Sequence, residues 1–419
     1  MTLTLAITLG LLFTTAIVGS RISQLPKNIW LLFLAMPLAM CAAPMVVLCG
    51  GLLGVKMAPT PELATLPLTL MILGTAGGVV PASMLMQKIG RKNGTMVGFS
   101  IAIIGALAAS AAAVFSNFWL LIAGAVMLGF CMAFVAQLRF AALDSLADAK
   151  LNPKAISVLM TSGLFAAMLG PEIAVSASDL IESPHGFAGS FMVLSVLFFV
   201  AIIIISRLDP MAATVEESHA NARDLPQIIK QPLFLIALSS SAIGYTVMSY
   251  VMTASPLNMH EFHDFDLASV KWIIQSHILA MYLPSLVSAA LVRYLGLNKL
   301  MLLGAILYSI VVAVAISGHS LMHYWWAMVL LGIGWNFLYT TGTLLLPQTH
   351  HSNERFKVQA VNDFGVFFSQ ALASLSAGVI LFSQGWTILI YISIPVILLM
   401  FMMSIWFYLI RRTNSASVS

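Results

Sequence analysis

Long apolar stretches separated by short polar segments run along the whole chain. Two of these stretches, residues 93–138 and 364–410, contain no Lys, Arg, Asp or Glu over 46 and 47 residues. A membrane-spanning helix needs about 20 apolar residues to cross roughly 30 Å of hydrocarbon, so each stretch is long enough for two helices. Small polar residues break each stretch once, at Ser116-Asn117 and at Ser383-Gln384-Gly385. Each stretch therefore predicts a helical hairpin within a membrane.

Composition agrees with this pattern, because 60% of the 419 residues are hydrophobic and only 8% are charged. Soluble domains carry about 25% charged residues, so the chain is expected to be an all-α, multi-pass membrane protein. Residues 1–20 form a further uncharged run, which is either an additional span or a misassigned start. The length criterion predicts twelve core spans, at residues 29–53, 64–86, 94–114, 118–142, 155–178, 188–206, 232–255, 268–292, 299–317, 323–347, 358–382 and 386–410.

The basic residues test this arrangement. Seventeen of the 19 Lys and Arg residues fall on one predicted side, and only Lys56 and Lys271 fall on the other. Lys and Arg resist translocation, so the first side is expected to be cytoplasmic. The predicted parts, in chain order, are an N-terminal hydrophobic segment with a basic linker (1–28), a first six-helix bundle (29–206), a cytoplasmic linker (207–231), a second six-helix bundle (232–410) and a cytoplasmic tail (411–419).

Several kinds of chemistry have no sequence signal. No Walker-type phosphate loop and no HExxH pair occurs, so neither ATP hydrolysis nor any other enzymatic activity is expected. Cys41, Cys49 and Cys131 lie in apolar runs without disulfide or metal-site spacing, and no cofactor is expected. The net charge of +4 is spread over many short loops, which argues against a nucleic-acid partner.

The loop after the second core span carries Gly90-Arg91-Lys92, with Gln87 three residues before the glycine. This loop resembles the signature loop between helices 2 and 3 of the major facilitator superfamily, and a degenerate second copy, Arg293 to Lys299, follows helix 8. The family usually has Asp at the position of Gln87, where it meets the amino-terminal end of helix 11. Glutamine can accept an N–H bond but brings no charge, so Gln87 and Arg91 are expected to form a weaker latch.

The resemblance covers about residues 29–410, and the part from helix 10 onward, Gly334 through Phe364, looks like a bacterial branch of uncharacterised carriers. It implies two pseudo-symmetric six-helix bundles that move a small organic solute by alternating access, as a monomer among the lipids of the bacterial inner membrane. The alternatives are a passive uniporter, or a receptor or scaffold that kept the fold without transport.

In that family, helices 1, 4, 7 and 10 line a central cavity. Trp335, in helix 10, is the tryptophan that does not fall near a predicted span end, and Tyr339 lies four residues on, on the same face. Asn336 brings an amide to the middle of the span, and helix 7 offers Tyr245 and Ser249 on one face. These five residues are the expected substrate-binding set, with close helix packing as the alternative reading.

Two protonatable residues lie inside apolar runs. Glu172 follows Gly170-Pro171 in helix 5, and His277 lies at a similar depth in helix 8. Helices 5 and 8 are neighbours in the family, so this pair is expected to share a coupling proton. The alternatives are a static hydrogen-bonded pair or no contact.

A gate is expected at the cytoplasmic ends of helices 4 and 11. Arg139 and Asp363 occupy these ends, which approach each other in the outward-open state of the family. Arg139 could instead be an ordinary basic residue that reaches toward the membrane surface, and Asp363 a first-turn acid that complements its helix dipole.

Overall fold

The computed structural model describes residues 3–146, 148, 151–209, 223–351 and 354–416. Every regular element in these residues is a helix, which confirms the predicted all-α class for the described chain. Eleven of the described helices and helical stretches are long and apolar enough to cross a membrane. The last of them, Lys357–Arg411, is 55 residues long and contains two of the predicted spans.

The chain forms two compact units, and the boundary between them falls inside one helix, α12 (Leu267–Tyr282). Unit 1 comprises Met1–Val215 and Asp264–Gln275, and unit 2 comprises Glu216–His263 and Ser276–Ser419. Unit 1 contains the start of α12 together with α1 (Leu3–Ile22), α2 (Lys27–Met40), α3 (Ala42–Met45), the π-helix η1 (Val46–Gly50), α4 (Gly51–Met57), η2 (Pro61–Leu63), α5 (Leu66–Ile89), α6 (Arg91–Phe115), α7 (Phe118–Asp144), α8 (Asn152–Ser176) and α9 (Ala188–Ser206).

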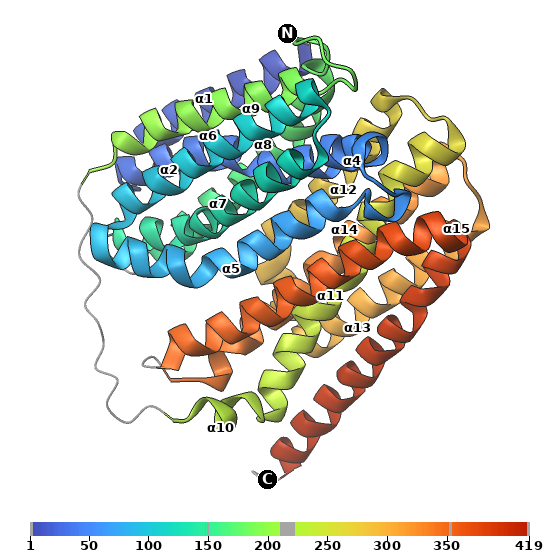
Figure 1. The fold of residues 1–419 in the computed structure, drawn as a ribbon. Coiled ribbons are helices and arrows are strands. Elements are labelled where there is room, and N and C mark those ends of the chain that lie inside the picture. The colour runs from blue at the N-terminus through green and yellow to red at the C-terminus, as the bar shows by residue number, and fades with distance from the viewer. Residues whose placement is uncertain (1–2, 147, 149–150, 210–222, 352–353, 417–419) are drawn as a thin grey trace. The chain divides into compact units, whose positions relative to one another are not determined.

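Unit 2 contains the rest of α12, together with α10 (Leu225–Ile229), α11 (Pro232–Leu257), the π-helix η4 (Asn258–Phe262), η5 (Leu283–Val287), α13 (Ser288–Ser317), α14 (Leu321–Leu345), η6 (Leu346–Thr349) and α15 (Arg355–Ala416). Figure 1 shows α15 as two arms that meet at a sharp bend. Gly385 makes this bend with a positive φ of 80°, at the break predicted in the apolar run 364–410.

Every predicted core span overlaps an observed helix, but two spans are less regular than predicted. The span at 29–53 is built from α2, α3, η1 and α4, with Pro37 inside α2 and a π-turn at Val46–Gly50. The span at 268–292 is α12 followed by the short 3₁₀ helix η5 and the start of α13. Residues 210–222 of the predicted linker and 417–419 of the predicted tail lie outside the described residues.

The uncharged run near the amino terminus is an additional helix, α1. It contacts α2 and α8 in unit 1. A Cβ atom added to Gly19 would lie 2.0 Å from the Trp30 ring, so only glycine allows this approach. The Trp30 indole N–H also donates to Ser23 Oγ at 3.0 Å. With 20 residues of high hydropathy, α1 is long and apolar enough to cross a membrane.

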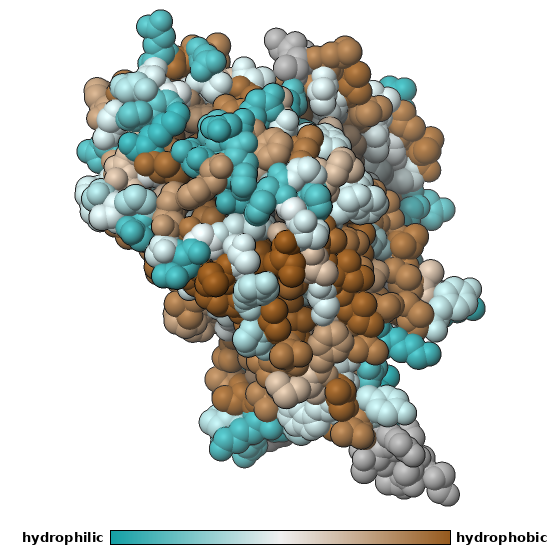
Figure 2. Space-filling view, turned by 90° about the vertical axis from the view of Figure 1, so that its right-hand side faces the viewer, coloured by the Kyte–Doolittle hydropathy of each residue, from teal (hydrophilic) through white to brown (hydrophobic). Residues whose placement is uncertain are grey.

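Large apolar side chains cover much of the molecular surface. Phe115, Phe199 and Met402 are each more than half exposed. Figure 2 shows such side chains over much of one face. Soluble proteins rarely expose contiguous apolar patches of more than a few hundred Å², whereas hydrocarbon accepts them. The surface is therefore that of a protein embedded in lipid.

The two loops predicted to be copies of each other have the same backbone conformation. Gly90 lies between α5 and α6 with φ 83° and ψ 157°. Gly296 lies inside α13 with φ 74° and ψ 161°. This region of positive φ and extended ψ is open essentially to glycine alone. Gly90 and Gly296 therefore occupy the same kind of backbone turn, one in each half of the chain.

We expect Gly296→Ala to destabilise the protein by about 1–3 kcal/mol, since the new Cβ meets no neighbour and the loss is backbone strain alone. The control is Gly77→Ala, because Gly77 is an exposed helical glycine that also has open space around it. The thermal midpoint Tm of the purified protein in detergent measures both. Equal Tm values for the two variants would show that the positive φ is not a constraint on the fold.

The described end of the predicted linker is clamped to the start of α15. Arg223 donates to Glu354 from its backbone N–H and its guanidinium, at 2.8 and 2.6 Å. Glu354 also accepts the backbone N–H of His351 at 2.9 Å, and Lys357 donates to the Arg223 carbonyl. The Glu354 side chain is fully buried although it is ionic. Its hydrogen bonds with Arg223 hold the pKa of Glu354 well below its usual range.

This lowered pKa predicts a direction of pH dependence. A carboxyl group whose folded-state pKa is depressed contributes stability above its unfolded-state pKa of about 4.3 and loses it as the pH falls toward the folded value. We expect the Tm difference between the parent and Glu354→Gln to be largest near pH 7 and to shrink below about pH 4. A Tm difference that does not change with pH would contradict the clamp.

Candidate functional site

Four aromatic side chains of unit 2 form one cluster, contributed by α11, α12 and α14. The Trp335 and Tyr339 rings of α14 are stacked, with centroids 4.9 Å apart and planes 8° apart. Tyr245 of α11 stands edge-on to both, at 5.2 Å from Trp335 and 5.6 Å from Tyr339. Tyr282, at the end of α12, contacts Trp335 at 6.4 Å. We call Tyr245, Tyr282, Trp335 and Tyr339 the aromatic cluster.

Glycines in α14 and its neighbours bring these helices close enough for the rings to meet. A Cβ at Gly332 would lie 2.6 Å from the His277 carbonyl of α12, and one at Gly342 would lie 2.1 Å from Ser241 of α11. Gly334 is packed against the Tyr308 ring of α13, and Tyr308 donates to the Gly244 carbonyl of α11 at 2.7 Å. Without a hydrophobic driving force in lipid, such small-residue contacts stabilise helix association.

Three residues of the predicted substrate-binding set, Trp335, Tyr339 and Tyr245, lie in the aromatic cluster, whereas Tyr282 was not predicted. Ser249 lies one turn along α11 from Tyr245 and is buried. Tyr282 could have been found from the sequence only if α12 had been known to end beside Trp335. The role of these residues in binding remains a proposal.

Asn336 uses its amide to join helices. Its Nδ2 group donates to the Met281 carbonyl at 2.8 Å and to Ser285 Oγ at 2.7 Å, and the residue is 2% exposed. These contacts match the packing alternative considered for Asn336, and they fix α14 against the end of α12 beside the aromatic cluster. Asn336 is therefore placed to orient Trp335, its neighbour in the chain.

His277 lies fully buried in α12 and contacts α14. Its Nδ1 atom is 2.7 Å from the Met328 carbonyl, which can only accept, so Nδ1 carries the proton. The other ring nitrogen, Nε2, has no hydrogen-bond partner in the described structure. A neutral His277 thus presents a buried, unused acceptor.

Glu172 forms an ion pair that the sequence analysis did not predict. Its Oε2 atom is 2.8 Å from Nζ of Lys271, at the start of α12, and the Glu172 residue is 3% exposed. One helical turn further along α12, Gln275 donates to the Met168 carbonyl of α8 at 3.1 Å. Lys271 carried a signal in the sequence, since it is one of only two basic residues predicted on the outer side.

The Gly-Pro sequence before Glu172 has a packing role in unit 1. A Cβ at Gly170 would lie 2.4 Å from Pro44 of α3, so glycine lets α8 approach the irregular span of α2 to α4. Pro171 cannot donate to the carbonyl four residues earlier and kinks helices at such positions. Gly170 and Pro171 therefore set the path of α8 at the residue that forms the ion pair.

The basic loop between α5 and α6 binds to its own unit. Arg91 donates from Nε to Asp144 Oδ2 at 2.5 Å and from its guanidinium to Gln137 at 3.3 Å, both on α7. Lys92 donates to the Leu208 carbonyl after the end of α9 at 2.9 Å, where carbonyl groups attract cations. Gln87 is exposed. Asp144 was not predicted, because nothing in the spacing showed that α7 ends beside this loop.

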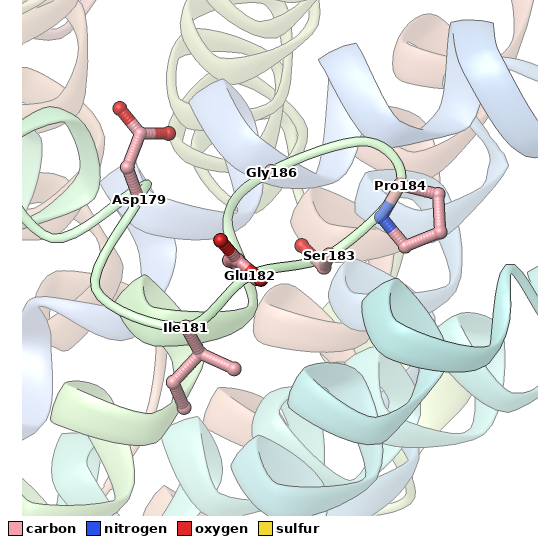
Figure 3. A pocket seen from close by; sticks show the side chains of 6 residues that line it. All are labelled: Asp179, Ile181, Glu182, Ser183, Pro184 and Gly186. Carbon is pink, nitrogen blue, oxygen red and sulfur yellow. The ribbon is translucent and has the colours of Figure 1, made fainter.

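The described chain also has a surface pocket in the loop between α8 and α9, with a volume of about 490 Å³. Figure 3 shows that it is lined by loop side chains, including Asp179 and Glu182. None of the predicted site residues lines this pocket, and Glu182 lies exposed to solvent. The aromatic cluster, rather than this pocket, is the candidate substrate site.

The sequence matches the Major Facilitator Superfamily over residues 52–347 and 238–419. The riboflavin transporter RfnT of Brucella anthropi is 34% identical over 376 residues, which cover 89% of this chain and 94% of that protein. The uncharacterized MFS-type transporter YdeG of Bacillus subtilis is 30% identical over 372 residues, covering 85% and 86%.

The chain belongs to the major facilitator superfamily. The predicted fold is confirmed by a solved structure, that of a bacterial homologue of the iron transporter ferroportin in an outward-facing state. It matches with a TM-score of 0.63 and 15% identity, over 91% of this chain and 99% of the other. At this identity the likeness concerns the fold alone. Membership makes the protein a multi-pass membrane transporter for a small molecule and not an enzyme.

Within the superfamily, Arg139 and Asp363 are the expected inner gate. Arg139 is half-buried in α7 of unit 1. Asp363 lies in α15 of unit 2, and its Oδ1 atom accepts from Asn362 at 3.1 Å. The gate remains a prediction, and so does the weaker latch at Gln87 and Arg91.

We expect Lys271→Gln to destabilise the protein by roughly 3 kcal/mol, because it leaves the Glu172 carboxylate buried without its cation. Adding Glu172→Gln to Lys271→Gln should recover part of this loss, because no uncompensated charge then remains. The Tm values of both single variants and the double variant give the coupling energy. Strictly additive losses would show that the two side chains do not interact.

Proposed function

We propose that the protein is a proton-coupled secondary transporter of the bacterial inner membrane. By alternating access it moves a planar aromatic solute of the flavin type, bound at the aromatic cluster. The observation that carries this proposal is the parallel stack of Trp335 and Tyr339 with Tyr245 edge-on to both. Offset-stacked and edge-to-face contacts are the ways in which aromatic rings attract one another, so the cluster suits a further flat ring.

The relative from Brucella anthropi supports the same solute class, because its name describes a riboflavin transporter and the similarity covers most of both chains. Riboflavin is therefore the first solute to test. Ligand sites in helical membrane proteins are lined mainly by apolar and aromatic groups with a few placed polar ones. Tyr245, Ser249, Trp335 and Tyr339 provide such a lining from two helices, and Asn336 holds the helix that carries Trp335.

Proton coupling is proposed for Glu172 and His277. Glu172 is an ionised carboxylate held by Lys271, and protonation would remove the charge that holds Lys271. Proton uptake would thus loosen α12 from α8, which connects protonation with helix movement. His277 Nε2 is a buried acceptor without a partner in the described structure, which supports His277 as a second proton-binding residue. One proton moving down 100 mV yields about 2.3 kcal/mol, enough for roughly a 50-fold solute gradient.

The test is riboflavin movement in proteoliposomes that contain the purified protein, with and without an imposed pH gradient. We expect saturable riboflavin transport that the pH gradient accelerates, and none in liposomes without protein. A transport rate that does not change with the pH gradient would favour the passive uniporter. Saturable binding without transport would favour the receptor alternative.

We expect Glu172→Gln to abolish accumulation of riboflavin against its gradient while riboflavin binding changes less than about threefold. The amide keeps the size and hydrogen bonding of the carboxyl group but cannot release a proton. The control is Glu182→Gln, the same change at an exposed carboxylate in the loop after α8. Normal concentrative transport by Glu172→Gln would remove Glu172 from the coupling mechanism and leave His277 to be tested in the same way.

A further inference from the structure

We infer that the indole N–H of Trp335 recognises the solute by donating a hydrogen bond to an acceptor on the edge of the solute. This inference rests on the proposed function and narrows its substrate class. The solutes would be planar heterocycles with carbonyl oxygens or ring nitrogens at their rim, and flat aromatic hydrocarbons would be excluded.

The inference starts from a donor without an acceptor. Trp335 is 4% exposed, and its Nε1 atom has no hydrogen-bond partner in the described structure. Two other tryptophans are comparably buried, and both donate. Trp30 donates to Ser23 Oγ at 3.0 Å, and Trp386 donates to the Ala315 carbonyl at 2.9 Å. Buried indole N–H groups usually have a partner, so Trp335 is the exception in its own protein.

The surroundings of Trp335 show that this donor is held in one orientation. Tyr339 covers one face of the indole at 4.9 Å, and Tyr245 and Tyr282 stand edge-on to it at planes of 87° and 72°. The backbone next to it is fixed by Asn336, which donates to Met281 and Ser285 of the neighbouring segment. A ring fixed on these sides cannot easily turn to find another acceptor, so its N–H direction is set before a ligand arrives.

An unpaired buried donor costs about 1–3 kcal/mol, and a ligand acceptor that pairs with it recovers this amount on binding. Packing alone does not require the N–H group, since a phenyl ring could stack on Tyr339 without it. Other described buried polar atoms also lack partners, for example Tyr250 Oη and His277 Nε2. Trp335 is the one among these three that lies in the aromatic cluster, where a flat ring would bind.

The chemistry of a flavin ring fits such a donor. Its fused rings offer a flat face to the aromatic cluster and carbonyl oxygens and ring nitrogens at the edge. A site built around a hydrogen bond rejects analogues that lack the partner far better than a hydrophobic site rejects a size change. For one hydrogen bond of about 1–3 kcal/mol, the expected discrimination is roughly 5- to 150-fold.

The experiment compares Trp335→Phe with Trp326→Phe in the full-length protein purified in detergent. Both changes keep an aromatic ring and remove an indole N–H group, but Trp326 is half exposed and lies outside the aromatic cluster, near the start of α14. Riboflavin binding is measured through quenching of flavin fluorescence. We expect Trp335→Phe to weaken binding at least tenfold and Trp326→Phe to change it less than about threefold, with Tm values close to the parent's.

A second measurement does not depend on the variant folding. Ultraviolet resonance Raman spectra of the parent contain a tryptophan band that responds to hydrogen bonding of the indole N–H. We expect riboflavin to shift part of this band, and the Trp335→Phe variant, where it folds, to lose that shift.

The outcomes separate the inference from the proposed function. Equal riboflavin binding by the parent and Trp335→Phe, or no Raman shift when riboflavin binds, would overturn the hydrogen-bond assignment and leave the flavin-type transporter standing. No binding of riboflavin by the parent would overturn both the proposed solute and the inference. Tenfold weaker binding by Trp326→Phe as well would show that the loss does not come from the Trp335 N–H group, and would overturn the assignment.

Discussion

The hydrocarbon interior of a membrane holds no water, so a polar group of the protein at that depth must find its hydrogen-bond partner within the protein. This constraint explains the contacts of unit 2, where Asn336 joins α14 to α12 and Trp386 donates to a backbone carbonyl. In unit 1 it explains why Glu172 is found beside Lys271. The indole N–H of Trp335 is an exception to this constraint. A fixed, buried donor such as the Trp335 N–H, left without a partner in the described structure, is costly unless a ligand uses it.

Helix positions were predictable because span length and charge asymmetry depend on the bilayer and not on tertiary packing. The twelve core spans and the shared turn at Gly90 and Gly296 follow from such local signals. The π-turn at Val46–Gly50 and the break after Tyr282 did not, since each depends on neighbouring helices. Pairs of interior residues were hardest to predict. Glu172 was recognised as a residue that needs a partner, but the identity of that partner, Lys271, required the register between α8 and α12.

The candidate site was predictable in its residue types and incomplete in its geometry. Trp335 stood out because it lies away from the span ends, and helical spacing placed Tyr339 on its face. Tyr245 is on a different helix, and its edge-on contact depends on the close approach that Gly342 allows beside Ser241. Sequence patterns describe one helix at a time, whereas the cluster exists only because glycines set the distances between helices.

The helix α12 belongs partly to each compact unit, so it makes one set of contacts within unit 1 and another within unit 2. Near its amino-terminal end, Lys271 and Gln275 bind α8 of unit 1. Near its other end, the Met281 carbonyl accepts from Asn336, the neighbour of Trp335. These ends are ten residues apart, about 15 Å along one continuous helix. Under the proposed function, a solute that orders Trp335 and a proton that neutralises Glu172 would each change contacts made by this one helix.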